Sequence, residues 1–505
     1  MKRNNSIYSK LATLFIGFAV VLTSCDLEVN PRQSIDAVGA LDTPNGIDAA
    51  INSIYGRLRV ESNYGRDLLA LADALADVGR TTSNSGRLIG ENNNQPNAHF
   101  TAGFWQNSYA AINEANLVLD QLQKGVPGAS AAQLARWEGE TKFLRALYYF
   151  DLVKAYSYIP TAIYTPGVTD QGGIPLELDG VITLEKALTR QTPRATIDQV
   201  YNQIYADLNS SIALLTVAGR GIQYASGAAA TALLSRVALY RGDWATAASA
   251  ATTALGTSVG RVTGVDNYVS GWRQSANPES MFEVRIQLAA ESLGVNVSLQ
   301  SSYTALLNLE NKNAQGGWGD FIPNATILGF FGLAPLQIGN PASDNNNWDV
   351  TRNSDVRAGL YTTGNTVRGA GRQIESTKFI SKNGFAFGDN IPVIRKSEMH
   401  LNRAEANYHL GNEAESLAEL NAFKALRGLG AVTVTGQALL DEILLERFKE
   451  FAFEGHRFFD LKRYGRPIIK TTPAVNVQFD DFRILPPIPQ REVDGNPNLN
   501  QNRGY

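Results

Sequence analysis

The segment 453–463, FEGHRFFDLKR, contains the residue types that carry out acid–base chemistry. His456 follows Glu454 closely and precedes Asp460 by one helical turn, so on a helix His456 and Asp460 could share a hydrogen bond. A histidine held by a carboxylate is a common general base. The segment has no serine, threonine or cysteine nucleophile and no second histidine for a metal ion. We therefore interpret it as a structural clasp, with a catalytic His–Asp–Glu set as the alternative.

The helix that would position these residues begins near Gly436. Its apolar residues share one face: Leu440, Leu444, Phe448 and Phe451. Its glutamates share another face: Glu446, Glu450 and Glu454. The spacing predicts the local ion pairs Arg447–Glu450 and Glu454–Arg457. Gly455 interrupts the helix at a cost of about 1 kcal/mol relative to alanine, which predicts close packing or a bend there.

The composition excludes several classes of function. The chain has 505 residues with a formal net charge of -3, so it lacks the basic surface of a nucleic-acid-binding protein. With one cysteine it can form neither a disulfide framework nor a multi-cysteine metal site. The sequence contains no phosphate-binding loop, zinc-protease motif, serine-hydrolase elbow or dinucleotide fingerprint. We predict no catalytic residue, no metal site and no cofactor.

The N-terminus has the pattern of an export signal. Lys2 and Arg3 precede an apolar run at 11–22, which is shorter than the roughly 20 residues that span a bilayer. The run ends in LTSC, which resembles a bacterial lipobox with Cys25 as the residue to be acylated. We predict that residues 1–24 are a lipoprotein signal peptide and that 25–505 form the mature body. The alternative is an ordinary signal peptide followed by a chance cysteine.

Periodic apolar residues predict a mainly helical scaffold over 44–257 and 391–463. Thr43 and Pro44 suit the cap and first position of its first helix. We expect helices over about 44–78, 130–157, 194–257, 394–427 and 437–462, with another beginning near Phe104. The segments around Tyr240 and Tyr408 each continue into a glycine turn and an alanine-bearing helix, the pattern of tetratricopeptide-like hairpins. The tail 464–505 reads as irregular.

Between 258 and 390 the helical pattern weakens and Gly, Asn, Ser and aromatic residues increase. The stretch ESMFEVRI alternates and predicts a strand. We interpret this region as an irregular, ligand-facing excursion, because binding residues concentrate on such loops. Candidate ligand-binding residues lie in its polar contexts: Trp272, Trp318, Trp348, Asp320 and Asn346. A tryptophan ring can pack on the C–H face of a sugar while polar side chains pair with hydroxyls. The alternative for each ring is that it packs its loop onto the scaffold.

Several stretches resemble the SusD/RagB family of outer-membrane lipoproteins. They are FWQNSYAAINEANLVLD, GETKFLRALYYFDLVKAYSYIP, SEMHLNRAEANYHLGN, LLERFKEFAFEGHRFFDLKRYGR and the ending IPQREVDGNPNLNQNRGY. The ending has Arg503 where the family usually has proline, a small departure. The resemblance implies a helical scaffold with tetratricopeptide-like units and no catalysis. It also implies a lipid anchor on the outer face of the outer membrane, and capture of an oligosaccharide or other nutrient for a SusC-like TonB-dependent transporter.

Two other functions stay open at this point. A tetratricopeptide-like scaffold could serve as a protein–protein interaction platform, although the polar, aromatic excursion argues against this. A surface glycoside hydrolase would need a carboxylate pair, and the 48 acidic residues offer no specific one.

Overall fold

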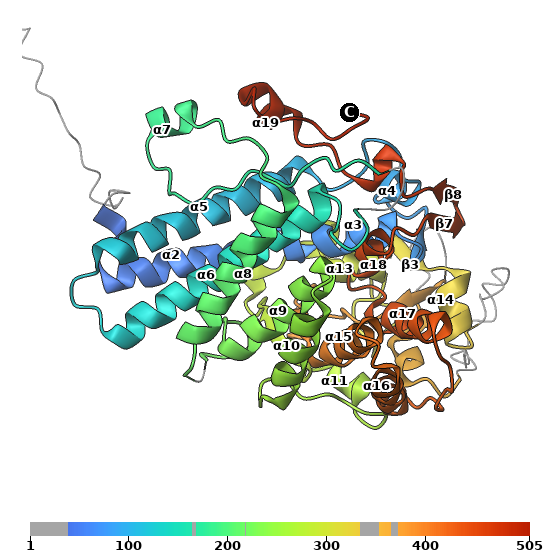
Figure 1. Cartoon of the computed structure of the whole chain (residues 1–505). Helices are drawn as coiled ribbons and strands as arrows, with labels where there is room; N and C mark the ends of the chain where they lie inside the picture. Colours follow the sequence, from blue (N-terminus) through green and yellow to red (C-terminus); the bar gives the residue numbers. More distant parts are fainter. Residues whose placement is uncertain (1–38, 164–167, 218, 334–352, 365–371) are drawn as a thin grey trace, which may run out of the picture.

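The computed structural model describes residues 39–163, 168–217, 219–333, 353–364 and 372–505 (Figure 1). The predicted signal peptide, Cys25, Asn346 and Trp348 lie outside the described residues, so the predictions made for them stay predictions. The described body is mainly helical, which confirms the predicted fold class. Within it, none of the helices has the length and apolar character needed to cross a membrane.

The scaffold is a row of antiparallel helices in which each helix packs on the next. The neighbours in this row run from α2 through α5, α6, α8, α9, α10 and α15 to α16 and α17. Their bounds are α2 Pro44–Leu58, α5 Ala102–Lys124, α6 Ala131–Tyr156, α8 Ile197–Leu214, α9 Gly227–Arg241, α10 Trp244–Gly256, α15 Lys396–His409, α16 Glu413–Leu426 and α17 Gln437–Phe451. The first helix begins as predicted, because the Thr43 hydroxyl accepts from the Gly46 N–H at 3.1 Å and Pro44 occupies the first turn.

Shorter helices flank this row. They are α3 Asp67–Leu75, α4 Ile89–Asn92, α7 Leu184–Thr189, α11 Tyr268–Gly271, α12 Gly294–Val297, α13 Leu299–Tyr303, α14 Ala325–Phe330, α18 Arg457–Arg463 and α19 Gln490–Gly495, with single 3₁₀ turns at Gly39–Leu41, Ala289–Glu291, Val356–Leu360 and Phe482–Ile484. Helices α11 to α14 all lie in the excursion between α10 and α15. Because α10 packs directly on α15, the excursion leaves the row and returns to the same place.

The two predicted hairpin turns, α9–α10 and α15–α16, share their chemistry. Gly242 and Gly411 both have left-handed φ values, 80° and 81°, which end the first helix of each pair. In the first hairpin the Ser235 hydroxyl donates to the Ala247 carbonyl at 3.0 Å, and in the second the Ser416 hydroxyl donates to the Ala404 carbonyl at 2.6 Å. Small residues at these positions let the paired helices approach closely.

The predicted helix over 44–78 is broken in the structure. It separates into α2, a π-helical turn at Glu61–Gly65, and α3. A Cβ at Gly65 would lie 2.4 Å from the Arg59 carbonyl oxygen and 2.5 Å from the Leu293 side chain. The chain turns at this point because only glycine allows such close packing.

Four two-stranded antiparallel ribbons complete the described fold. The pairs are β1 Gly79–Thr81 with β3 Phe321–Pro323, β2 Ser280–Val284 with β6 Ile391–Arg395, β4 Tyr361–Thr363 with β5 Ile374–Ser376, and β7 Ile468–Thr471 with β8 Ala474–Val477. The strand predicted in ESMFEVRI is β2, and the β7–β8 hairpin in the tail was not predicted. The β1–β3 ribbon places the loop after Thr81 beside the loop before Phe321.

Candidate functional site

The charges of the 453–463 segment belong to a buried ion network. Glu450 is fully buried and accepts hydrogen bonds from Arg395 at 3.0 Å and from Arg427 at 2.8 Å. Burial alone would raise the pKa of Glu450, but the guanidinium groups of Arg427 and Arg395 outweigh it and hold the pKa far below its usual range. We define the Glu450 network by its linked side chains: Glu279, Arg357, Lys378, Arg395, Arg427, Glu446, Glu450 and Glu454.

The local ion pairs predicted within this helix are wrong. Glu454 accepts from Lys378 and Arg395 rather than from Arg457. Arg447 approaches Asp460 at 3.4 Å. Arg457 reaches Asp77 at 2.7 Å instead. Each of these charges pairs with a partner on another element, and an ion pair removed from water is stronger than the same pair in water.

Gly455 confirms the prediction of a bend with close packing. The chain leaves α17 at Phe451 and enters α18 at Arg457, and Gly455 between them has φ 74°. A Cβ there would lie 2.7 Å from the Leu69 Cα on α3. The junction is therefore fixed against the start of the scaffold.

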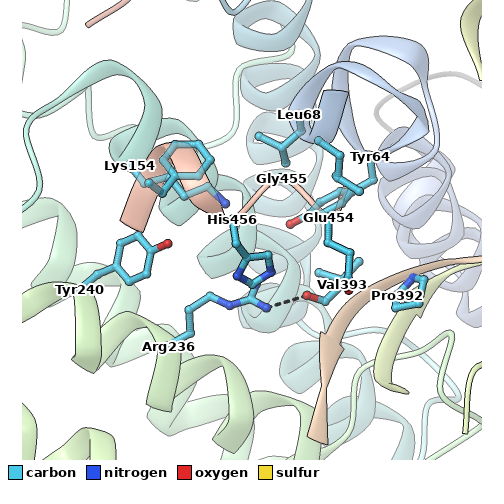
Figure 2. Close-up of a pocket in the computed structure, with 12 residues that line it drawn as sticks. Tyr64, Leu68, Lys154, Arg236, Tyr240, Pro392, Val393, Glu454, Gly455 and His456 are labelled. Atoms are coloured by element: carbon cyan, nitrogen blue, oxygen red, sulfur yellow. Dashed lines mark hydrogen bonds between the residues drawn. The ribbon is translucent and has the colours of Figure 1, made fainter. Parts of the chain in front are cut away.

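His456 sits beside a cavity that is too small for a substrate. Its ring stacks on Phe451 with centroids 4.4 Å apart. Burial, together with the positive charges of Arg236 and Arg447, lowers the pKa of His456 well below its usual value, so the ring is neutral. The cavity that His456 shares with Arg236 and Glu454 measures about 30 Å³, which is room for a few waters at most (Figure 2). Asp460 accepts from Arg463 at 2.8 Å. These contacts favour the structural clasp over a catalytic set.

The arrangement that fits ligand binding lies at one end of the β1–β3 ribbon. We call it the Trp318 surface and define it by Asn84, Arg87, Asn296 and Trp318. Asn84 and Arg87 come from the loop after β1, Trp318 from the loop before β3, and Asn296 from α12. Since Thr81 pairs with Phe321, the two loops emerge side by side.

Backbone contacts fix the Trp318 loop in place. The Trp318 N–H donates to the Ser301 hydroxyl at 3.0 Å, and the Gly319 N–H donates to the Ser301 carbonyl at 2.8 Å. Gly317 packs so closely that a Cβ would lie 2.3 Å from the Thr304 carbonyl oxygen. The glycines around Trp318 therefore let the loop lie flat on α13 while its ring stays half-buried at the surface.

Polar groups surround the ring of Trp318. Its Nε1 donates to the Asn296 amide oxygen at 3.3 Å, and the same oxygen accepts from Arg87 Nη2 at 2.9 Å. The Arg87 guanidinium carbon lies 5.6 Å from the ring centroid. Asn84 donates to the Trp318 carbonyl at 2.7 Å. A flat ring with a guanidinium, the exposed Asn296 amide and the half-buried Asn84 amide nearby matches the chemistry that recognises a sugar ring.

The structure corrects the interpretation of two predicted ligand residues. Trp272 is 1% exposed, with Lys378 and Arg395 over its ring, so it packs its loop onto the Glu450 network. Asp320 is 2% exposed and accepts from the Ser85 hydroxyl, which ties together the two loops of the Trp318 surface. Neither side chain is presented at the surface. A flanking run of polar residues did not distinguish these buried positions from exposed ones.

Sequence reasoning missed Asn84, Arg87 and Asn296. The first two lie in a stretch interpreted only as a long polar loop, and Asn296 lies far along the chain in an unremarkable short helix. The ribbon pairing that brings them together has a strand of three residues on each side, which is too short to carry a periodic signal. Among the residues that the structure describes, no cluster of three or more histidine, cysteine or carboxylate side chains could hold a metal ion.

Comparison with known proteins covers most of the chain. A family model described as the SusD family matches residues 310–505, and one described as starch-binding and associating with the outer membrane matches residues 27–239. SusD-like protein P2 of Formosa agariphila is 25% identical over 552 aligned residues, which cover 98% of this chain and 100% of the relative. The starch-binding protein SusD of Bacteroides thetaiotaomicron is 32% identical over 125 residues, 23% of this chain and 22% of that protein.

Solved structures share the whole architecture. A SusD superfamily protein of B. thetaiotaomicron superposes with a TM-score of 0.75 at 25% identity, covering 91% of this chain and 99% of that one. A laminarin-binding SusD-like protein superposes with a TM-score of 0.69 at 23% identity, covering 92% of this chain and 100% of that one. With matches to both halves of the sequence, full-length relatives and the same fold, this chain belongs to the SusD/RagB family.

Proposed function

We propose that this protein captures an oligo- or polysaccharide at the cell surface and delivers it to a SusC-like TonB-dependent transporter, without catalysis. The observation that carries the proposal is the half-buried ring of Trp318, held beside Arg87 and Asn296 on a rigid loop. The ring would pack on the apolar face of a pyranose, and the guanidinium and amide groups would pair with its hydroxyls.

Two observations support a place on the outer membrane. The matching model for residues 27–239 describes proteins that bind starch and associate with that membrane. The LTSC sequence supplies Cys25 for acylation, and multiple acyl chains give firm anchoring where one chain alone is marginal. We propose that Cys25 is the lipidated N-terminus of the mature protein and that the body faces the cell exterior.

A binding panel tests the glycan role. Soluble α- and β-linked polysaccharides are titrated into the mature protein, and the best ligand is then titrated into Trp318→Ala, Arg87→Ala and Trp244→Ala. The matched control is Trp244, half-buried on α10 and stacked on His409 at 4.0 Å, away from the Trp318 surface. We expect the first two variants to lose about tenfold in affinity, roughly 1.4 kcal/mol, and the control to lose nothing. Unchanged glycan affinity in both Trp318→Ala and Arg87→Ala would show that the binding site lies elsewhere in the protein.

Co-purification from the membrane tests the transporter role. The lipidated protein is extracted in mild detergent and its partners are identified by mass spectrometry. We expect a TonB-dependent barrel to accompany it. Absence of any barrel and of any glycan binding would overturn the proposal. Release of reducing ends by the purified protein would instead support the surface hydrolase, and partner binding that survives removal of the excursion would support the interaction platform.

A further inference from the structure

A second cavity lies beside α2 and is lined by none of the residues that define the Trp318 surface. It measures about 290 Å³ and lies between α2, the loop before α9 and the segment that begins with β2. Its polar and aromatic lining includes Asn52, Arg59, Gln223, Tyr224, Arg285 and Glu291. The volume is close to the lower end of the roughly 300–1,000 Å³ typical of small-molecule sites. A single sugar-sized ligand suits this space better than an extended chain.

The aromatic wall of this cavity is fixed in advance. Tyr224 packs edge-on against Tyr55 with centroids 5.3 Å apart, and the Arg220 guanidinium lies 3.8 Å from the Tyr224 centroid. The Tyr55 hydroxyl accepts from the Ala225 N–H at 2.8 Å, which anchors the loop that carries Tyr224. A ring held in this way loses little conformational freedom when a ligand packs on it.

The carboxylates at the cavity already have donors. Glu291 accepts from Arg59 at 2.6 Å and from the backbone N–H groups of Gln287 and Leu288. Glu283 is 2% exposed and accepts from the Asn390 side-chain amide at 2.9 Å. Both acids are therefore committed to the protein.

Arg285 differs from these groups. Its Nε is buried and has no hydrogen-bond partner among the described residues. Leaving a buried donor unsatisfied costs about 1–3 kcal/mol, more when the group is charged. A ligand that supplies an acceptor to this nitrogen would recover that cost. The Glu291 carboxylate already interacts with the Arg285 charge, but it leaves Nε without a hydrogen bond. Since a guanidinium pairs best with a planar carboxylate, a ligand carboxylate is the acceptor that suits this nitrogen best.

We propose that this cavity binds a carboxylate-bearing pyranose, a uronic acid unit, with its carboxylate on Arg285 and its ring against Tyr224. The exposed Asn52 and half-buried Gln223 amides would pair with its hydroxyls. This site is separate from the Trp318 surface and does not depend on the transporter role.

A matched pair of sugars tests the proposal. D-glucuronate and D-glucose differ at one carbon, and each is titrated into the mature protein with ligand-detected NMR. We expect saturable binding of glucuronate at least about tenfold tighter than that of glucose, because a carboxylate accepts from a guanidinium more strongly than a hydroxyl does. Equal affinity for the two sugars, or no saturable binding of glucuronate, would overturn the proposal.

Variants locate the site. Arg285→Gln should lose about tenfold in glucuronate affinity, and Tyr224→Ala provides a second route if the first variant folds poorly. Arg241→Gln is the control, because Arg241 lies at the end of α9 and bonds Asn202 instead. Unchanged glucuronate binding in both cavity variants would refute the site, as would loss of that binding in Trp318→Ala. Loss of polysaccharide binding in Trp318→Ala with glucuronate binding retained would separate this site from the proposed function.

Discussion

Arginines, carboxylates or amides, and aromatic rings meet around Glu450 and again around Trp318. At the Glu450 network, Glu450 is fully buried and its oxygens accept from protein guanidinium groups. At the Trp318 surface the ring is half-buried and Asn296 is exposed. The first region buries its polar groups in the fold, whereas in the second they bond to Trp318 and to one another at the protein surface. The charged cluster around Glu450 therefore serves the fold, whereas the Trp318 surface is the region that we propose for ligand binding.

Glu450→Ala should produce the largest loss of stability, and it tests most directly whether the Glu450 network serves the fold. Removing the carboxylate leaves Arg395 and Arg427 buried without their shared partner, so we expect a loss of about 3–5 kcal/mol in the free energy of unfolding. Chemical denaturation measures this loss. Glu415→Ala, at an exposed position on α16, is the control and should change stability little. A loss below about 1 kcal/mol for Glu450→Ala would contradict the structural role of the network.

The two tryptophans should respond in opposite ways. Trp272 is 1% exposed, so Trp272→Ala should cost about 3 kcal/mol or more in stability through the cavity it leaves. The folded fraction should keep its glycan affinity. Trp318→Ala should instead cost affinity with a smaller loss of stability, since its ring is only half-buried. Chemical denaturation and glycan titration of both variants measure the two quantities. Loss of glycan affinity in Trp272→Ala, with loss of stability alone in Trp318→Ala, would show that we assigned the two regions the wrong way round.

Asp73 bonds to α13, which carries the Trp318 loop, and to Gly455, which follows Glu454 of the Glu450 network. Titration of Asp73 should change the free energy of unfolding with pH. Its carboxyl accepts from the Tyr303 hydroxyl on α13 at 2.8 Å and from the Gly455 N–H at 3.2 Å. Burial raises its pKa from 3.8 to about 8. Between these values the folded state holds a proton that the unfolded state releases, so this group's contribution to stability falls as pH rises.

Asp73→Asn removes this titration, so the variant should gain about 2 kcal/mol relative to the natural protein as pH rises from about 6 to about 8. Urea unfolding at the two pH values provides the measurement. Asp441→Asn, with a side chain 52% exposed, is the matched control and should show no such gain. Parallel pH profiles for Asp73→Asn and the natural protein would show that this carboxyl is ionised in the fold.

His456→Ala should have the smallest effect on stability, and it tests whether the segment 453–463 has any part in ligand binding. Loss of the ring stacked on Phe451 should cost about 1–2 kcal/mol of stability, while glycan affinity of the folded protein stays the same. Thermal unfolding and the glycan titration together measure both quantities. Loss of glycan affinity without loss of stability would contradict a structural role and would favour the catalytic His–Asp–Glu set in the segment 453–463.

Periodicity in the sequence was enough to predict the helical scaffold, because it depends on residues close in sequence. Single residue types predicted the Thr43 cap and the bend at Gly455. The partners of Glu454 and Arg447 could not be predicted, since they come from other elements. The same limit applies to the site. Trp318 was found from its glycine-rich context, but Arg87 and Asn296 join it only through the β1–β3 pairing and α12.

The direct packing of α10 on α15 has a consequence for how this fold can diversify. The excursion between them is closed at its neck by the β2–β6 ribbon and by Arg395 bonded to Glu279 at 2.7 Å. An exchange of segments between relatives should therefore be cut at α10 and α15, outside this clip. Within those limits an exchanged segment would have to keep Glu279, Arg357 and Lys378, which bond to Arg427 and to α17. A new glycan preference would also have to suit the loop after β1, because Asn84 and Arg87 lie beside Trp318.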